Sequence, residues 1–289
     1  MACGIVIVDK PSGWTSQDVT AKLRGVFHEK RIGHGGTLDP MATGVLPVFV
    51  GRATRAVPYF ESAEKTYVAG LRLGITTNTQ DTEGEILTQT AVSVTEAELE
   101  RVLCRFRGEL QQIPPMYSAV KIGGKKLYEL ARRGEEIQRP ARKITVFSLE
   151  LLGMRNGDRL LKIHCSKGTY VRTLCHDIGA ALGCGGAMSS LRRIRAGAYE
   201  ERQAVALEEL ISSDCPERYL MPVDSLFSEY PEVIFDRKQT ERCFHGAEIR
   251  MSLPRSGRYR VYDENGVFLM LGVYEAGVMR TEKSFFEVN

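Results

Sequence analysis

The most informative stretch of this chain reads Gly33-His34-Gly35-Gly36-Thr37-Leu38-Asp39-Pro40-Met41-Ala42-Thr43-Gly44-Val45-Leu46. It holds a single carboxylate, that of Asp39, in a glycine-rich loop just before residues 44–50, which read as a strand. Glycine lets the backbone approach a ligand closely, and loops carry a large share of functional residues. An isolated Asp-Pro is more often an ordinary turn or helix start. Asp39 is therefore a candidate for chemistry that other motifs must support.

The composition around this loop is that of a folded protein. The chain has 289 residues, of which 43% are hydrophobic and 26% charged, which predicts one large domain or two smaller ones. No apolar run is long enough to cross a bilayer, and the N-terminus has neither a basic leader nor an Arg/Ser-rich transit segment. The seven cysteines are scattered without a Cys-x-x-Cys pair or a His cluster, which disfavours a disulfide framework and a metal site. We expect a cytoplasmic protein.

The charge is unevenly distributed, although the net value is only +3. Residues 121–143 and residues 159–202 each carry eight Lys or Arg against three acids, whereas residues 203–236 carry one Arg against eight acids. Basic segments beside an acidic one indicate a positive face of the kind that binds nucleic acid. Solvated helix faces give the same pattern.

Hydrophobic spacing predicts the elements of an α+β fold. Strands are expected at residues 4–8, 44–50, 65–74, 85–88, 144–153, 159–165 and 191–198. Helices are expected at residues 16–28, 54–62, 96–107, 127–133, 170–182 and 207–212, with a loop at 75–84. Ser16 is the expected cap of the first helix, and Thr95 with Glu98 forms a capping box before the third. Because helices interrupt long hairpins instead of alternating with strands, we expect a large mixed or antiparallel sheet with flanking helices.

The segment 111–143 reads as an inserted arm, with Pro114-Pro115, a Gly123-Gly124 turn and the basic charge. The acidic residues 203–236 read as a connection. Short strand patterns separated by glycines follow it, which predicts a small β-rich module at residues 231–289 after a first domain at residues 1–230.

Several common motifs are absent from the sequence. It has no Gly-x-x-x-x-Gly-Lys-Ser/Thr, no His-Glu-x-x-His and no Gly-x-Ser-x-Gly, and Leu38 stands where Gly-x-Gly-x-x-Gly needs its last glycine. The sequence thus offers no binding motif for a metal or a dinucleotide beside Asp39.

The stretch around Asp39 closely resembles the active-site motif of the tRNA pseudouridine synthases of the TruB family. Other segments match motifs of that family in the same order, between residue 4 and about residue 200. They are residues 9–16 (DKPSGWTS), 65–67 with 73–74 (KTY and LG), 114–121 with 124–134 (PPMYSAVK and GKKLYELARRG), 166–174 (SKGTYVRTL) and 191–197 (LRRIRAG). Five ordered motifs are far more specific than any one of them.

The chemistry that this resemblance implies suits one carboxylate. Conversion of uridine to pseudouridine breaks an N-glycosidic bond, turns the base over and forms a C–C bond at the same sugar carbon, so neither a redox cofactor nor a metal is needed. An ionised carboxylate near the sugar can trap the electron-poor C1′ or take a sugar proton. The sequence leaves covalent attack and elimination both open. Because RNA phosphates favour a protonated carboxyl, a neighbouring guanidinium is needed to keep Asp39 charged.

The resemblance assigns roles to individual residues. Asp39 is the catalytic carboxylate, Arg172 its ion-pair partner, and Tyr67 stacks on the flipped base and accepts the C5 proton. Tyr170 is a second aromatic candidate, Leu191 contacts the base, and His34 fills space among the displaced bases. Each of these four residues also has an ordinary interpretation. Tyr67 is then an aromatic residue of a strand and Tyr170 one that packs at a helix start. Leu191 is then a core leucine and His34 a loop histidine. Lys10 is expected to support the Asp39 loop. The expected phosphate contacts are Lys125, Lys126, Arg132, Arg133, Arg192 and Arg193.

The implied activity is formation of pseudouridine at uridine 55 in the T loop of tRNA, in an RNA-binding cleft of a monomer without a cofactor. The module after residue 231 resembles the small PUA-type RNA-binding barrel that ends many members. Two alternatives stay open. One is an RNA chaperone that folds the tRNA elbow without chemistry and does not need Asp39. The other is a related synthase that acts on a guide-RNA complex, a branch that usually has longer basic tails.

Overall fold

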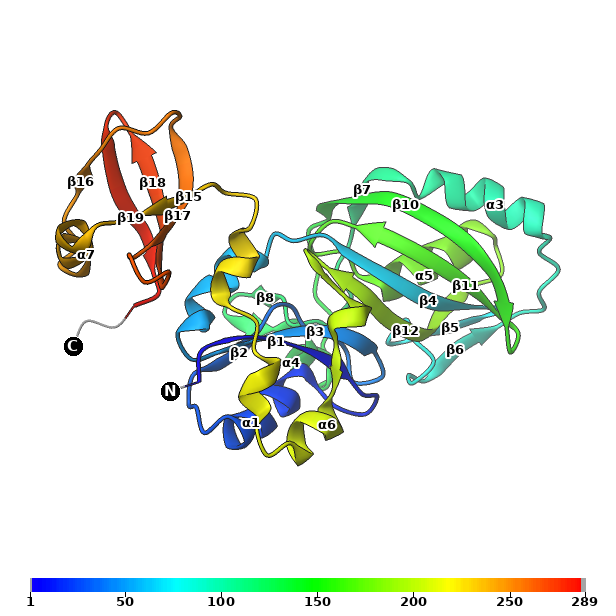
Figure 1. The fold of residues 1–289 in the computed structure, drawn as a ribbon. Coiled ribbons are helices and arrows are strands. Elements are labelled where there is room, and N and C mark those ends of the chain that lie inside the picture. The colour runs from blue at the N-terminus through cyan, green and yellow to red at the C-terminus, as the bar shows by residue number, and fades with distance from the viewer. Residues whose placement is uncertain (1, 287–289) are drawn as a thin grey trace.

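A ten-stranded mixed sheet forms the centre of the molecule (Figure 1). The computed structural model describes residues 2–286. The strands lie in the order β14 (Val205–Ala206), β1 (Gly4–Lys10), β3 (Thr43–Val50), β12 (Gly186–Ala196), β4 (Lys65–Leu73), β11 (Asp158–Cys165), β10 (Arg142–Arg155) and β7 (Gly108–Gln112), with β2 (Ile32–His34) on β3 and β13 (Tyr199–Glu200) on β12. The predicted α+β class with a large mixed sheet is therefore confirmed.

The two halves of this sheet meet at one short junction. β12 pairs with β4 along most of its length, but it pairs in parallel with β3 only through Arg192 with Thr43 and Arg193 with Gly44. Gly44 has φ +99°, and a Cβ at this position would lie 2.3 Å from the Arg193 carbonyl oxygen. Only glycine fits this approach without moving the backbone. The junction thus follows directly after the loop that carries Asp39.

Helices cover the sheet on both sides of the junction (Figure 1). The helical elements are α1 (Ser16–Val26), η1 (Gly51–Ala56), α2 (Val57–Phe60), α3 (Glu96–Arg105), α4 (Leu127–Ala131), α5 (Val171–Ala181), η2 (Glu201–Gln203), α6 (Leu207–Ser212), η3 (Pro216–Tyr219), η4 (Val223–Phe227) and α7 (Arg237–Phe244). The capping box of Thr95 and Glu98 is confirmed for α3. In α1, however, the N-cap is Thr15, in a capping box with Asp18, and not Ser16.

Both faces of the sheet are buried near its N-terminal strands. In β1, Val6 and Val8 pack into one hydrophobic cluster with α1, whereas Ile5 and Ile7 pack into a second with Phe49. Side chains of a strand alternate between its two faces, so burial on both sides explains why β1 is a continuous apolar run. Each such buried Val or Ile contributes about 1.5–3 kcal/mol of transfer free energy. The strands next to the Asp39 loop are therefore packed on both faces.

The boundaries of several elements differ from the sequence predictions. The expected loop at 75–84 begins as β5 (Ile75–Thr77), which pairs with β6 (Ile86–Gln89). The expected helix at 54–62 is the 3₁₀ turn η1 followed by α2, which ends at Phe60. The ends of the expected arm belong to the main sheet, because β7 and β10 pair through residues 111–112 and 142–143. The arm proper contains β8 (Lys121–Ile122), β9 (Lys125–Lys126) and α4.

The C-terminal part has its own five-stranded sheet, which lies to one side of the main sheet (Figure 1). Its strands lie in the order β15 (Glu232–Ile234), β17 (Gly257–Tyr262), β18 (Phe268–Glu275), β19 (Val278–Ser284) and β16 (Ile249–Arg250). A separate hydrophobic cluster around Phe235 and Val261 fills it. The expected β-rich character is confirmed, and α7 was not foreseen. The ends of the two expected domains, residue 1 and residues 287–289, lie outside the described residues, and the boundary at 230/231 stays a prediction.

Candidate active site

Asp39 and Arg172 form an ion pair between the glycine-rich loop and the first turn of α5. Arg172 Nε lies 2.9 Å from Asp39 Oδ2, and Nη2 donates to Oδ1 at 3.3 Å. The Asp39 side chain is 33% exposed, whereas that of Arg172 is 7% exposed. A two-point contact fixes the carboxylate plane. The pair therefore presents an oriented and accessible carboxylate above a buried cation.

Side chains of the N-terminal segment form hydrogen bonds with the backbone of the Asp39 loop. The buried Lys10 donates from Nζ to the carbonyls of Pro11, Trp14 and Pro40, the last at 3.1 Å. The Ser16 hydroxyl accepts from Leu38 N–H at 2.9 Å, which explains why Thr15 is left to cap α1. The expectation that Lys10 supports the Asp39 loop agrees with these contacts.

A second acidic residue, Asp81, contacts Arg172 from the connection between β5 and β6. Its Oδ2 lies 3.6 Å from Arg172 Nη1, and its side chain is 8% exposed. The guanidinium also donates to the backbone carbonyls of Thr79 and Tyr117. Arg172 thus links α5 to three other segments, which are the Asp39 loop, the connection between β5 and β6, and the base of the arm. Asp81 is not among the residues that the sequence predicts for the site, since an acidic residue in an expected loop gives no local signal of burial.

The pKa of Asp39 lies above its ordinary value. Burial raises it most, the nearby Arg172 guanidinium lowers it, and the Asp81 carboxylate raises it again. Removal of the Arg172 charge should therefore raise the pKa of Asp39, and removal of the Asp81 charge should lower it. Arg172, and to a smaller extent Lys10, favours the ionised form of Asp39.

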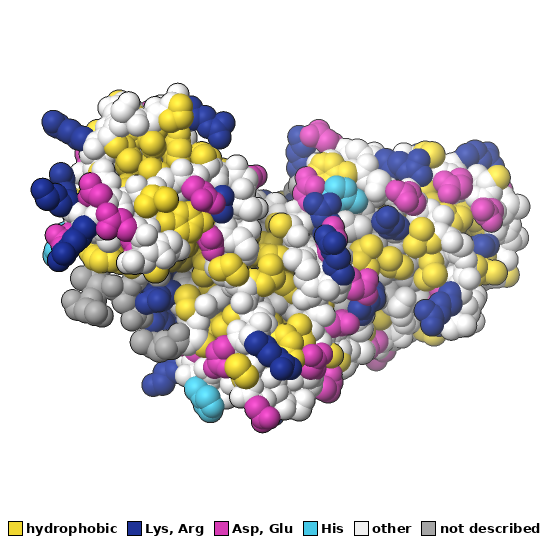
Figure 2. All heavy atoms as spheres, in the orientation of Figure 1, with side chains coloured by type: hydrophobic (Ala, Val, Ile, Leu, Met, Phe, Trp, Pro, Cys, Tyr) yellow, Lys and Arg dark blue, Asp and Glu magenta, His cyan; other side chains and the backbone are white. Residues whose placement is uncertain are grey.

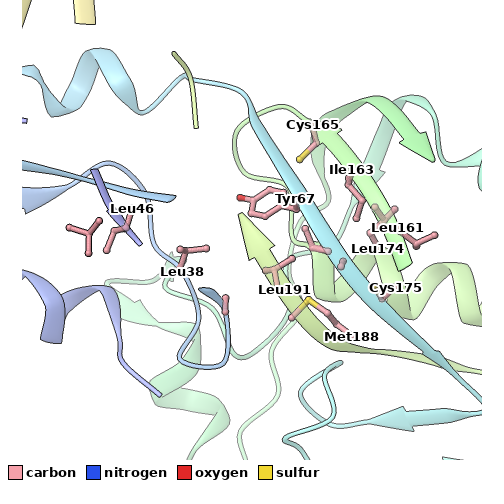
Figure 3. Packing of buried hydrophobic residues seen from close by; sticks show 14 of the residues in the cluster. Leu38, Leu46, Tyr67, Leu161, Ile163, Cys165, Leu174, Cys175, Met188 and Leu191 are labelled. Atoms are coloured by element: carbon pink, nitrogen blue, oxygen red, sulfur yellow. The ribbon is translucent and has the colours of Figure 1, made fainter. Parts of the chain in front are cut away.

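Tyr67 lies on β4 with its ring directed toward the Asp39 loop (Figure 3). Figure 3 shows Leu191 of β12 beside it and Leu38 across from its hydroxyl. Tyr67 and Leu191 are both only 8% exposed. Burial raises the pKa of Tyr67, and the positive charge of Arg193 lowers it. The structure thus brings together Asp39, Arg172, Tyr67 and Leu191.

His34 and Tyr170 border this group. His34 ends β2, and its Nδ1 is buried without a hydrogen-bond partner, while Nε2 lies 3.4 Å from the Gln17 amide. Burial and then Arg193 lower its pKa. The backbone of Tyr170 both donates to and accepts from the Gln112 amide, which fixes the start of α5. A role of the Tyr170 side chain in base binding stays a prediction.

The predicted phosphate contacts occupy three different environments. On the arm, Lys125, Arg132 and Arg133 are exposed, whereas Lys126 is half-buried with its ammonium over the ring of Tyr128. Arg192 lies in ion pairs with Asp9 and Glu201. Arg193 is only 1% exposed.

The position of Arg193 corrects one expectation. Its guanidinium donates to the carbonyls of Val45 and Gly36 inside the protein, so it does not lie on a surface that an RNA phosphate can reach. Arg192 is at the surface but already has two carboxylate partners. The arm, in contrast, carries basic groups that face solvent.

The arm lies behind the main sheet in Figure 1. On the face drawn in Figure 2, basic and acidic side chains are interspersed and form no large patch of one sign. This face offers no extended positive surface of the kind that nucleic acid requires. No helix within residues 2–286 has the length and hydropathy to span a membrane.

Because Lys10 is buried, we expect the free energy of unfolding to depend on pH. Desolvation lowers its folded-state pKa to about 8 from 10.5, so the unfolded chain binds more protons than the folded one between these values. Stability should therefore rise as pH increases through this window. Urea unfolding across the window should show a steeper rise for the native chain than for Lys10→Met. Lys238→Met, at an exposed position on α7, is the control, and an unchanged slope in Lys10→Met contradicts the prediction.

Comparisons with known proteins agree with this arrangement. Residues 24–171 match the family model described as TruB family pseudouridylate synthase (N terminal domain). Residues 172–228 match the model described as tRNA pseudouridylate synthase B C-terminal domain. Arg172, the partner of Asp39, thus begins the second match.

Individual relatives cover nearly the whole chain. The tRNA pseudouridine synthase B of Clostridium kluyveri is 42% identical over 275 residues, 93% of this chain and 95% of that protein. That of Ectopseudomonas mendocina is 44% identical over 276 residues, 93% of this chain and 90% of that protein. A chain in the crystal structure of a Cbf5-Nop10-Gar1 complex is 27% identical with a TM-score of 0.73, over 98% of this chain and 85% of that one.

Proposed function

We propose, on the premise that this chain belongs to the TruB family of pseudouridylate synthases and forms pseudouridine in tRNA, that its target is uridine 55 in the T loop. The observation that carries the proposal is the Asp39–Arg172 pair, in which an accessible carboxylate is oriented by a buried guanidinium. A carboxylate so held suits a reaction at an electron-poor sugar carbon. The segments that position it are the ones that resemble the family motifs.

Asp39 acts at the ribose of the flipped nucleotide. With one oxygen on Arg172 Nε and the other on Nη2, the carboxylate keeps lone pairs directed away from the guanidinium. It then attacks C1′ or takes a sugar proton as the glycosidic bond breaks. Both routes need the ionised form, which Arg172 favours.

The base binds between Tyr67 and Leu191. An aromatic ring stacks on a base that has left the RNA helix, and Leu191 supplies an apolar contact from the neighbouring strand. Both residues are 8% exposed, so the base must displace neighbouring groups to reach them fully. The Tyr67 hydroxyl accepts the C5 proton in the last step. His34 and Tyr170, at the border of this group, fill space around the displaced bases.

The position of the target base is tested with unmodified tRNA transcripts. Native enzyme should form one pseudouridine in the full transcript and none when uridine 55 is replaced by cytidine. Replacement of uridine 54 by cytidine is the matched control and should leave the product at position 55. Nucleoside digestion with mass spectrometry after chemical labelling of pseudouridine measures each product. Pseudouridine at another position of the uridine-55-blocked transcript contradicts the proposed target.

The exposed basic residues of the arm bind phosphates of the T stem. Arg132 and Arg133 face solvent just after α4, and Tyr117 at the base of the arm contacts Arg172 through its carbonyl. Binding of RNA by the arm is thereby coupled to the site. Lys125 and Lys126 lie on the short hairpin before α4 and extend the same basic surface.

The double substitution Arg132→Ala/Arg133→Ala should weaken tRNA binding and reduce its salt dependence. Each lost phosphate contact lowers the slope of log affinity against log salt by about 0.9. Filter binding at rising salt measures both quantities. Arg101→Ala/Arg105→Ala, which removes two exposed arginines from α3, is the control with the same net charge. Equal affinity in the two double variants is incompatible with phosphate binding by the arm.

We also propose that the chain acts as a monomer in the cytoplasm, without an obligatory protein partner, metal or cofactor. Residues 1–230 act as the catalytic domain, and the module from residue 231 binds RNA. Light scattering of the purified chain with and without tRNA measures the oligomeric state, and a dimer at assay concentration contradicts the monomer.

A further inference from the structure

Arg193 is a fully buried cation without a carboxylate partner among the described residues. It is 1% exposed, and its Nε and Nη2 donate to the carbonyls of Val45, at 2.7 Å, and Gly36, at 3.1 Å. A buried charge without an opposite charge is costly. The phenol of Tyr67 lies close enough for the guanidinium to lower its pKa against the larger, opposing effect of burial. Such a cation needs an explanation beyond packing.

Strand register explains how Arg193 reaches Tyr67. The two residues are directly paired across β12 and β4, so their side chains lie on the same face of the sheet. A register shift follows directly after Arg193 on β12, and Arg192 faces Asp9 on the other side. The junction of the sheet halves therefore aims one arginine of the pair at the phenol.

Three other basic side chains lie within electrostatic reach of Arg193. Burial lowers the pKa of Lys10 on β1, Lys65 on β4 and His34 on β2 most, and Arg193 lowers each of them further. Tyr67 is the group that can take a negative charge in contact with the guanidinium. The other groups that influence the Tyr67 hydroxyl are Cys165 on β11, whose own pKa is raised to about 11, and Asp39. Burial, Cys165 and Asp39 all raise the pKa of Tyr67, and Arg193 is the group that lowers it.

We propose that Arg193 is a positioning residue for Tyr67, which holds the phenol oxygen and stabilises its anionic form so that this oxygen accepts the C5 proton of the base. The inference rests on the proposed function, because it concerns the last step of that reaction. It assigns to Arg193 an indirect role, since Arg193 itself touches no RNA.

The step balances as a tautomerisation. After C5 has bonded to C1′, the base carries a proton on C5 and a C6=N1 double bond. The C5–H bond breaks, its proton moves to the Tyr67 oxygen, and its electron pair forms C5=C6. The former C6=N1 pair moves to N1, which takes a proton from solvent. No oxidant or further reactant is needed, and loss of the phenol proton to solvent restores Tyr67.

The test compares Arg193→Gln and Arg193→Lys in enzyme with Tyr67 and in enzyme with Tyr67→Phe. Single-turnover rates are measured against pH, with tRNA that carries protium or deuterium at C5 of the target uridine. Arg193→Gln should lower the rate about tenfold or more at neutral pH, since one unit in the pKa of the acceptor is a factor of ten. The rise of rate with pH should move to higher pH, the deuterium effect should increase, and tRNA affinity should stay within about twofold.

In Tyr67→Phe enzyme, the same Arg193→Gln change should cost less than about threefold, because the group through which it acts is gone. Arg193→Lys keeps the charge and should restore part of the rate and of the pH profile. Arg195→Gln, at an exposed position of the same strand, is the matched control. Since Arg193→Lys retains a buried cation that can still donate to the two carbonyls, it carries the test if Arg193→Gln folds poorly.

If Arg193→Gln lowers the rate equally with and without the Tyr67 hydroxyl, the inference is wrong. Arg193 would then only connect the Asp39 loop to β3 through its hydrogen bonds. An unchanged deuterium effect in Arg193→Gln would also overturn it. Either result is compatible with normal pseudouridine formation by the native chain, so failure of this inference is distinguishable from failure of the proposed function.

Discussion

Asp39→Asn should abolish pseudouridine formation while tRNA binding persists. Asparagine keeps the shape of the side chain, but it is a poor nucleophile and a poor base. We expect the single-turnover rate to fall by about 10⁴-fold or more, as for removal of a reacting group in other enzymes. Affinity should change little, because the exposed basic residues of the arm are untouched. Release of the C5 proton from labelled tRNA measures the rate, and filter binding measures affinity.

The variant should remain folded, since the loop is held by backbone groups. The carbonyl of Pro40 accepts from Lys10, and Leu38 donates to Ser16, and neither contact uses the Asp39 side chain. Asp214→Asn, at an exposed position after α6, is the matched control and should be fully active. Pseudouridine in the T loop from Asp39→Asn enzyme would exclude Asp39 as the reacting group. A native chain that binds tRNA without product supports the chaperone alternative instead.

The Asp39 loop was predictable because its information is local. Glycines, Asp-Pro and the following apolar run are adjacent in sequence, and the strand that they predict exists as β3. The supporting contacts were less accessible. Thr15 and Ser16 are both good helix caps, and the choice between them depends on Leu38, which is 22 residues from Ser16 in the chain and takes Ser16 as its own partner.

Arg192 and Arg193 show what residue type alone misses. Adjacent arginines suggest one basic patch, but residues 191–198 were expected to form a strand, where neighbouring side chains face opposite sides. The two arginines therefore had to lie on opposite faces of the sheet, and they could not form one basic patch. The period of two was a usable signal, and it predicts the difference between Arg192, with its surface ion pairs, and the buried Arg193.

Asp81 could not be found in this way. Its contact with Arg172 joins residues that are 91 positions apart in the chain, and its place is set by the pairing of β5 with β6 and by an isolated bridge to Met188. Neither feature follows from local periodicity. Asp81 matters energetically because Arg172 pairs with two carboxylates, and that of Asp81 is more deeply buried than that of Asp39.

Arg172→Met should lower both stability and activity. Loss of the guanidinium leaves Asp81 and Asp39 without their shared cation and the carbonyls of Thr79 and Tyr117 without a donor. Removal of one partner from a buried ion pair typically costs about 3–5 kcal/mol. The partial exposure of Asp39 reduces its share of this loss, so we expect about 3 kcal/mol by urea unfolding. Activity at neutral pH should fall by about 10²-fold or more.

The pH dependence separates the two effects. Burial already raises the folded-state pKa of Asp39, and Arg172 lowers it more than Lys10 does, so Arg172→Met should raise it further. The acid limb of activity, where Asp39 becomes protonated, then moves to higher pH. Since the folded state binds this proton more tightly than the unfolded chain, stability should fall as pH rises through the window between the ordinary Asp value and the raised one. In Arg172→Met that window extends to higher pH.

Two further variants complete the argument for Arg172. Arg172→Lys keeps the charge but lacks the planar fork that contacts both Asp39 oxygens, so it should recover stability more than activity. Arg172→Met/Asp81→Asn removes the buried carboxylate that lost its partner, and it should regain part of the stability without regaining the rate. An acid limb in Arg172→Met at the native pH would mean that this guanidinium does not control ionisation of Asp39. The electrostatic basis of the proposed mechanism would then be wrong, even if Asp39 itself is essential.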